Sequence, residues 1–223
     1  MTPRQAPDLP PTAAADLPAK PKRVRLVPEV RRQQILDAAL IEFGALGLTA
    51  ASISKIAARA GTSKANLYVH FANKDEIFES LLKVLLVPTN SIWRPMQPGQ
   101  DMQASIDAYV DELFGGLTPQ SMAIMRLLIA ESHRIPALAN RWYEQTIVPT
   151  KVEQQQHIDA YVAAGQLRKT PLSDYFGFAM APVLYAAIMQ MVFGGQIAES
   201  ESHKAKETLR KLLHMMLPAV AAS

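Results

Sequence analysis

The chain has 223 residues, of which 49% are hydrophobic and 7% aromatic, and its formal net charge is +3 with a pI of about 9.1. The lack of cysteine excludes disulfides and thiolate metal sites, and no apolar signal segment opens the sequence, so we expect a cytoplasmic protein. The shortage of aromatic residues and of alternating apolar patterns favours an all-α fold.

Residues 1–27 are rich in proline and poor in bulky apolar side chains, which predicts a disordered arm. Basic residues gather at its end and continue into the next segment, namely Lys20, Lys22, Arg23, Arg25, Arg31 and Arg32. Two interpretations stay open: a solvated tail, or an arm that contacts the minor groove or the phosphates of DNA.

A helix-turn-helix pattern follows a longer helix predicted over 31–45. Ser52 is placed to cap a short helix, because its hydroxyl can accept the free amide groups of the first turn. Gly61 is expected to end that helix, since glycine alone adopts the left-handed conformation without steric cost. Ser63 can then cap a second short helix, and Asn73 with Glu76 predicts a capping box for a fourth helix.

The second short helix is predicted to pack through Leu67 and Phe71, which are four residues apart. Its other side chains would then lie outward: Lys64, Ala65, Asn66, Tyr68 and Val69. A short helix that presents a cation, an amide and a phenol can enter the major groove of DNA and contact base edges.

The residues Ile56-Ala57, Ala60-Gly61, Ser63-Lys64, Leu67-Tyr68, His70-Phe71 and Lys74 resemble the DNA-binding domain of TetR-type transcriptional regulators. The resemblance covers roughly residues 31–86 and implies a DNA-binding domain at 28–86. It implies that base edges face Lys64, Ala65, Asn66 and Tyr68, and that phosphates are held by Ser52, Tyr68, His70 and Lys74. The complete set of candidate DNA-binding residues is Ser52, Lys55, Ser63, Lys64, Ala65, Asn66, Tyr68, His70 and Lys74. Two positions depart from the family pattern, Ala51, where threonine is more common, and Val69, where an aromatic residue is more common.

Residues 87–223 are predicted to form a second helical domain for regulation and dimerisation, after a proline-rich break. Helices are expected over 101–114 and from Thr118 to about residue 133. A longer helix over 136–165 should kink or split at Pro149 and turn Val152 and Ile158 inward.

The segment 175–198 has no charged residue, but its glycines, proline and glutamines argue against a membrane span. A helix that is apolar on all sides is better explained by burial against both its own domain and a second subunit. The resemblance implies that this segment and the last helix, which follows Ser200, form a four-helix interface in a homodimer. An internal hairpin of a monomer is the alternative.

Methionine and aromatic residues recur in the second domain. Each is either a core residue or part of an apolar cavity, and the resemblance implies a cavity for a small effector. The candidate ligand-binding residues are Met122, Met125, Trp142, Tyr143, Phe176, Met180, Tyr185 and Met189, with Glu131, His133 and Gln190 as polar groups that could orient the ligand.

The sequence therefore predicts a ligand-responsive transcriptional regulator, most simply a repressor that binds a palindromic operator as a dimer. An activator or an effector-independent DNA-binding protein is the alternative. An enzyme is disfavoured, since the chain has no phosphate-binding loop, nucleophile elbow or zinc-protease motif. The pairs Glu153 with His157 and Glu199 with His203 lack a third metal ligand, and no cofactor is expected.

Overall fold

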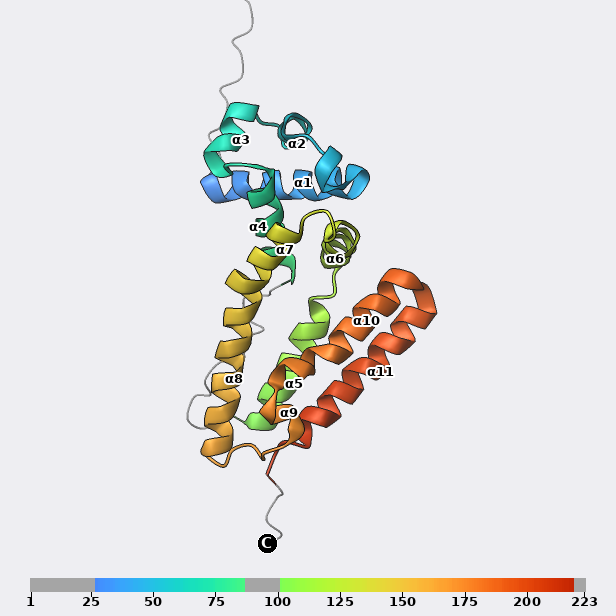
Figure 1. Ribbon diagram of the computed structural model, residues 1–223. Coiled ribbons are helices and arrows are strands. Elements are labelled where there is room, and N and C mark those ends of the chain that lie inside the picture. The colour runs from blue at the N-terminus through green and yellow to red at the C-terminus, as the bar shows by residue number, and fades with distance from the viewer. Residues whose placement is uncertain (1–26, 87–100, 219–223) are drawn as a thin grey trace, which may run out of the picture.

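The computed structural model describes residues 27–86 and 101–218 (Figure 1). These ranges contain helices and no strand, so the all-α fold class is confirmed. The predicted amino-terminal arm, apart from Val27, and the proline-rich break after Leu86 lie outside the described residues. The first four helices gather at one end of the molecule, and the remaining helices extend away from them (Figure 1).

The amino-terminal part consists of α1 (Pro28–Ala50), α2 (Ile53–Arg59), α3 (Lys64–His70) and α4 (Lys74–Leu86). α1 starts with a proline in its first turn, where the missing amide costs nothing. Gly47 interrupts its helical path with φ 75° and ψ 164°. This break turns the chain toward α2 and lets Leu48 enter the core.

The core of this part includes residues from beyond the proline-rich break. Buried side chains of α1–α4 surround Phe43 and Phe78, whose rings meet edge to face at 6.0 Å. Ile124, Leu127 and Leu138 belong to the same buried cluster, although they lie much later in the sequence. Helices α1–α4 are therefore anchored on the later helices by shared apolar burial.

The second part consists of α5 (Met102–Gly115), α6 (Pro119–Glu131), α7 (Pro136–Trp142), the π-helix η1 (Tyr143–Ile147), α8 (Val148–Ala163), α9 (Pro171–Asp174), the 3₁₀-helix η2 (Phe176–Met180), α10 (Ala181–Val192) and α11 (Gly195–His214). Thr118 caps α6 through Ser121, as predicted. The predicted helix is split just before Pro149: the π-helix η1 ends at Ile147, and α8 follows with Pro149 in its first turn. α7, η1 and α8 together form one long rod (Figure 1).

A second core joins α5, α8, η2, α10 and α11 around Ile106, Ile158, Phe176 and Leu209. Val152 was expected inward beside Ile158, but it is 51% exposed, so this prediction was wrong. The π-turn changes the phase of the rod, so residues counted through it at ordinary helical spacing fall on another face.

α10 and α11 form an antiparallel hairpin at the end of the chain (Figure 1). Gly194 and Gly195 make the turn with φ of 62° and 53°, the left-handed region that glycine favours. Among the described residues, no single helix has the length and apolar character to cross a membrane, and only the pair α5 and α6, bent by 66°, meets those criteria together.

Candidate nucleic-acid interface

Two serine caps and one glycine turn shape the helix-turn-helix. The Ser52 hydroxyl accepts a hydrogen bond from the Lys55 amide at 3.2 Å, and the Ser63 hydroxyl accepts one from the Asn66 amide at 3.1 Å. Gly61 has φ 61° in the turn between them. The structure therefore confirms the predicted local geometry of α2 and α3.

α3 has one buried side and one exposed side. Leu67 is fully buried and Phe71, directly after the helix, is nearly so. Lys64 and Ala65 are exposed, Tyr68 is 47% exposed, and the Lys64 ammonium lies 5.9 Å from the centroid of the Tyr68 ring. The exposed face thus carries cationic, small and aromatic side chains, the types that contact base edges when a helix enters a major groove.

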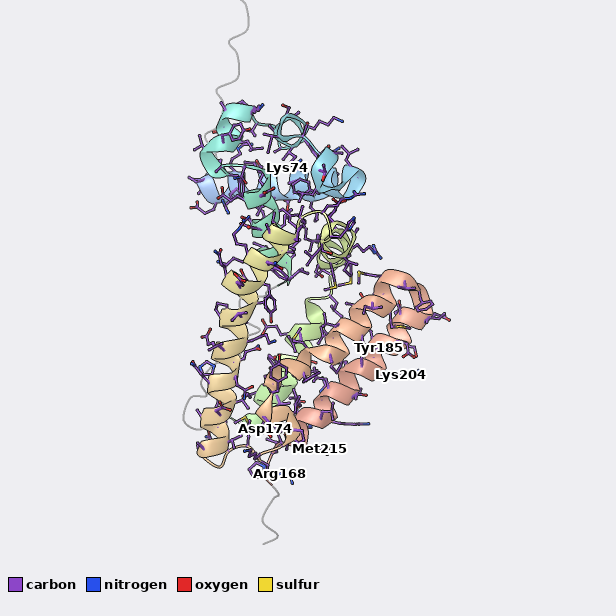
Figure 2. The ribbon with its side chains drawn as sticks, viewed as in Figure 1. Lys74, Arg168, Asp174, Tyr185, Lys204 and Met215 are labelled. Carbon is purple, nitrogen blue, oxygen red and sulfur yellow. The ribbon has the colours of Figure 1, made fainter. Side chains whose placement is uncertain are left out.

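Asn66 and Lys74 already have partners within the protein. The Asn66 side-chain amide donates to the Thr62 hydroxyl at 2.8 Å, which holds it against the turn. The Lys74 ammonium donates to the Thr49 and Ala51 carbonyls at 2.8 and 3.0 Å (Figure 2). Base contact by Asn66 would require rotation away from Thr62, whereas Lys74 retains a third N–H for a phosphate.

The remaining candidate residues lie at the edges of α2 and α3. Lys55 is exposed on α2, and Ser52 and Ser63 stand at the starts of the two helices. His70 is half-buried at the end of α3. These positions flank the exposed face of α3, as phosphate contacts flank base contacts in helix-turn-helix complexes.

Arg31 and Arg32 stabilise the unit from within, a role that the sequence did not reveal. Arg32 donates to the His70 carbonyl at 2.9 Å and to the Ser80 hydroxyl at 2.8 Å, and its guanidinium lies 4.1 Å from the centroid of the Phe71 ring. Arg31 donates to the Ala60 carbonyl at 3.1 Å. Both belong to α1 and tie it to the helices that follow, so they do not continue a basic tail.

Glu42 and Arg59 form a partly buried ion pair between α1 and α2. The Arg59 Nε lies 2.8 Å from Glu42 Oε1, and Glu42 is only 7% exposed. Because an unpaired carboxylate in this position would be costly, the pair fixes the relative position of the two helices.

Two sequence families account for most of the chain. Residues 35–81 match "Bacterial regulatory proteins, tetR family", and residues 107–219 match "AefR-like transcriptional repressor, C-terminal domain". The chain belongs to the TetR family. It is a helix-turn-helix transcriptional regulator, and its two matched regions correspond to the reading helices and to the larger helical part.

Curated relatives of this TetR-family chain are transcriptional regulators. The repressor SCO4008 of Streptomyces coelicolor is 31% identical over 137 residues, which are 61% of this chain and 64% of that protein. The nicotine-responsive repressor HdnoR of Paenarthrobacter nicotinovorans is 31% identical over 96 residues, 43% of this chain and 50% of HdnoR. In both cases the alignment covers less than two thirds of the relative.

Solved structures share the fold. A TetR-family regulator from Pseudomonas syringae pv. tomato superposes with a TM-score of 0.62 at 23% identity, covering 82% of this chain and 94% of the other. The SmeT–triclosan complex gives a TM-score of 0.62 at 20% identity, covering 87% and 96%. At these identities the likeness shows the fold alone.

The eight candidate ligand-binding residues do not gather in one described cavity. Met122 and Phe176 are buried in the protein, and Met125, Trp142, Met180 and Met189 are half-buried. Tyr143 and Tyr185 are about half exposed, and the Tyr185 hydroxyl donates to Glu201 at 2.5 Å. Of the eight, Tyr143 alone lines the described groove beside α8.

The three polar groups expected to orient a ligand lie apart. Glu131 is buried at the end of α6 beside Gly47, His133 is exposed, and Gln190 donates to the Ser202 hydroxyl at 2.9 Å. The sequence could not show that Glu131 lies between the two parts of the molecule, because its neighbour is far away in the chain. Within residues 27–86 and 101–218, no group of three acidic or histidine side chains could hold a metal ion.

Proposed function

We propose that this TetR-family protein is a ligand-responsive repressor that binds a palindromic operator as a homodimer and leaves it when a small apolar or aromatic effector binds. The observation that carries the proposal is α3, which is locked to the core through Leu67 and exposes a polar face beside it. A helix held in this way is pre-organised for the major groove.

The chemistry of the exposed side chains suggests how DNA would be read. Lys64 is suited to guanine O6 and N7, and Ala65 to a thymine methyl group. Tyr68 can contact a base or a phosphate. Lys55 and the capping residue Ser52 would contact the backbone, where each neutralised phosphate makes the affinity more sensitive to salt.

Homodimer formation is supported by an apolar stripe on the carboxy-terminal hairpin. Leu184, Ile188 and Val192 recur every fourth residue on α10 and are 47%, 51% and 64% exposed. Ile197 of α11 and Met215, directly after that helix, are 58% and 62% exposed. Exposed apolar side chains grouped on one hairpin are typical of protein interfaces, and a two-fold pairing of the hairpins would cover them.

A two-fold dimer would present two copies of α3. One short helix reads few base pairs, so specificity requires both copies on an inverted repeat. The half-sites should then lie about one helical turn of DNA apart, ~34 Å, or a multiple of it.

Effector control is supported by contacts between the regulatory and reading helices and by one unsatisfied group. α6 packs against α1 and α4, so movement of α6 would alter the distance between the two copies of α3 in a dimer. The buried indole N–H of Trp142 has no hydrogen-bond partner among the described residues. A polar group of this kind can orient a ligand in an otherwise apolar site. The names of HdnoR and of the SmeT complex pair those proteins with nicotine and triclosan.

The DNA part of the proposal is tested by selecting bound fragments from random DNA and titrating the selected operator by fluorescence anisotropy. Lys64→Ala should weaken binding and relax the preference at one position of each half-site by about 1–3 kcal/mol. Lys83→Ala, which removes an exposed lysine from the last turn of α4, is the matched control and should leave binding unchanged. An operator affinity and a sequence preference of the Lys64→Ala variant that match those of the original chain would contradict the role of α3.

The dimer part is tested by light scattering. Ile188→Glu places a charge in the middle of the stripe on α10 and should yield a folded monomer. Val84→Glu makes the same change at an exposed position of α4 and should leave the dimer intact. A dimer that tolerates Ile188→Glu would show that another surface holds the subunits together.

The sign of regulation is tested with a reporter gene placed behind the selected operator. A repressor lowers expression as its concentration rises, and the effector restores it. Expression that increases with the protein would instead establish an activator.

A further inference from the structure

A groove of about 280 Å³ runs along one side of α8, where this helix faces α9 and η2. Val148, Lys151 and Val152 line it from α8, and Tyr143 lines it from η1. Tyr175 and Gly177 line the opposite wall. We propose that this groove binds a small aromatic carboxylate.

The walls of the groove are suited to a flat apolar ring. Val152 is 51% exposed and Tyr175 is 48% exposed, although both are largely apolar. The Tyr175 ring is held edge to face by Phe178, with 5.2 Å between the centroids. A ring placed between valine methyl groups and a tyrosine face would remove this surface from water.

A cation lies inside the groove. The Lys151 ammonium donates to the Tyr175 hydroxyl at 2.6 Å and lies 5.0 Å from the centroid of that ring. The hydrogen bond to Tyr175 raises the pKa of Lys151 above its ordinary value, so the ammonium stays charged. An ammonium has three N–H donors, and those not used by Tyr175 are available to a carboxylate.

Asp174 also lines the groove, but its carboxylate is largely exposed to solvent and has a cationic partner. Its side chain is 59% exposed, and the Lys169 ammonium lies 3.7 Å from its carboxylate. Asp174 is the last residue of the short helix α9 (Figure 2). A cationic ligand would meet Lys151 on entering the groove, whereas an anionic ligand gains that charge as a partner.

The two walls are fixed before any ligand arrives. The Gln155 side chain accepts from the Phe176 amide at 2.9 Å and donates to the Ser173 carbonyl at 2.7 Å, which ties α8 to the opposite wall. Gly177 allows the close packing, since a Cβ there would lie 3.0 Å from the Lys151 side chain and 3.4 Å from the Tyr175 ring. Such pre-organisation lowers the entropic cost of binding.

This inference rests on the proposed function in one respect, because it treats the ligand as the effector of the repressor. It adds the chemical class of that effector and the place where it binds. Binding in the groove is measurable without DNA. The two can therefore fail separately.

The experiment follows the valine methyl resonances of the full-length protein by NMR during titration with benzoate. Benzoate should shift Val148 and Val152, and leave Val110 and Val183 of the second core unchanged. Benzamide, which has the same shape without the charge, should bind at least about tenfold more weakly, as expected for losing a hydrogen bond between charged groups. Benzylammonium should bind no better than benzamide.

Lys151→Met removes the charge while keeping an unbranched side chain against Tyr175, and should weaken benzoate by a similar factor. Lys83→Met is the matched control and should bind benzoate like the unaltered protein. Both variants should retain operator affinity in the absence of benzoate, which separates this test from that of DNA binding. Benzoate affinity that is unchanged by Lys151→Met, shifts confined to core valines, or no binding at millimolar benzoate would each overturn the proposal.

Discussion

Glu131 at the end of α6 packs directly against Gly47 in α1. A Cβ atom added to Gly47 would lie 2.9 Å from Glu131 Oε1, closer than Cβ atoms approach other heavy atoms. Glu131 is 7% exposed, and its partner Arg134 lies 3.5 Å away on the surface side. The kink in α1 therefore serves two purposes, since it redirects the chain toward α2 and leaves space for Glu131 of α6.

Gly47→Ala should destabilise the protein by about 1–3 kcal/mol, because alanine is strained at φ 75° and its methyl group would collide with Glu131. The measurement is the free energy of unfolding in urea. Gly44→Ala is the matched control, because Gly44 lies in the same helix with open space around its Cα. It should stabilise the protein by about 0.5–1 kcal/mol, and equal effects of the two changes would contradict this account.

Arg59→Met should cost about 1–3 kcal/mol of stability, since it leaves the Glu42 carboxylate buried without its partner. Adding Glu42→Gln to this variant should recover part of the loss, because no charge then remains buried. A double-mutant cycle measured by urea denaturation checks both statements. Additive effects of the two substitutions would show that the pair is not coupled.

Arg32→Met and Lys55→Met should separate a structural cation from a phosphate-binding one. Loss of Arg32 removes its bonds to the His70 carbonyl and to Ser80, so it should lower stability. The slope of log affinity against log salt should stay the same. Loss of the exposed Lys55 should leave stability unchanged and reduce that slope by about 0.9 for each phosphate that is no longer neutralised. A reduced salt slope for Arg32→Met together with lost stability for Lys55→Met would contradict both assignments.

Asp111 gives a pH-dependent contribution to stability. The hydrogen bond from Lys206, with Arg210 close by, holds the pKa of Asp111 below its ordinary value of 3.8. A lowered pKa in the folded state means that the contribution is present above pH 3.8 and is lost as pH falls through the folded-state value.

Asp111→Asn should therefore lower stability at neutral pH by at most about 1 kcal/mol, since the carboxylate is exposed to solvent. The difference between the two proteins should shrink in acid, as followed by urea denaturation at several pH values. A difference that grows below pH 3.8 would contradict this assignment.

The local features of the reading helices could be predicted from sequence because their causes lie within a few residues. Ser52, Gly61 and Ser63 act on amides or turns directly beside them. The fourth helix shows the limit of this reasoning. The Asn73 side chain accepts from the Glu76 amide as expected, but the Glu76 carboxylate accepts from the amide of Ala72 rather than from that of Asn73.

Features that depend on distant partners were not predictable. In the sequence, Arg32 is indistinguishable from the other cations of a basic stretch. Its structural role follows only from its partners on α3 and α4. The exposure of Val152 depends on the π-turn before α8, which shifts the helical phase. The groove itself joins α8 to residues of α9 and η2, so no single stretch of sequence contains it.

Footprinting of the purified protein on its selected operator is the most direct test of the proposed reading mechanism. We predict protection of an inverted repeat whose half-sites lie about one helical turn, ~34 Å, or a multiple of it apart. Lys64→Ala should abolish protection of both halves at the same protein concentration. Protection of one asymmetric site by a monomer, or no binding to any duplex at low ionic strength, would contradict it.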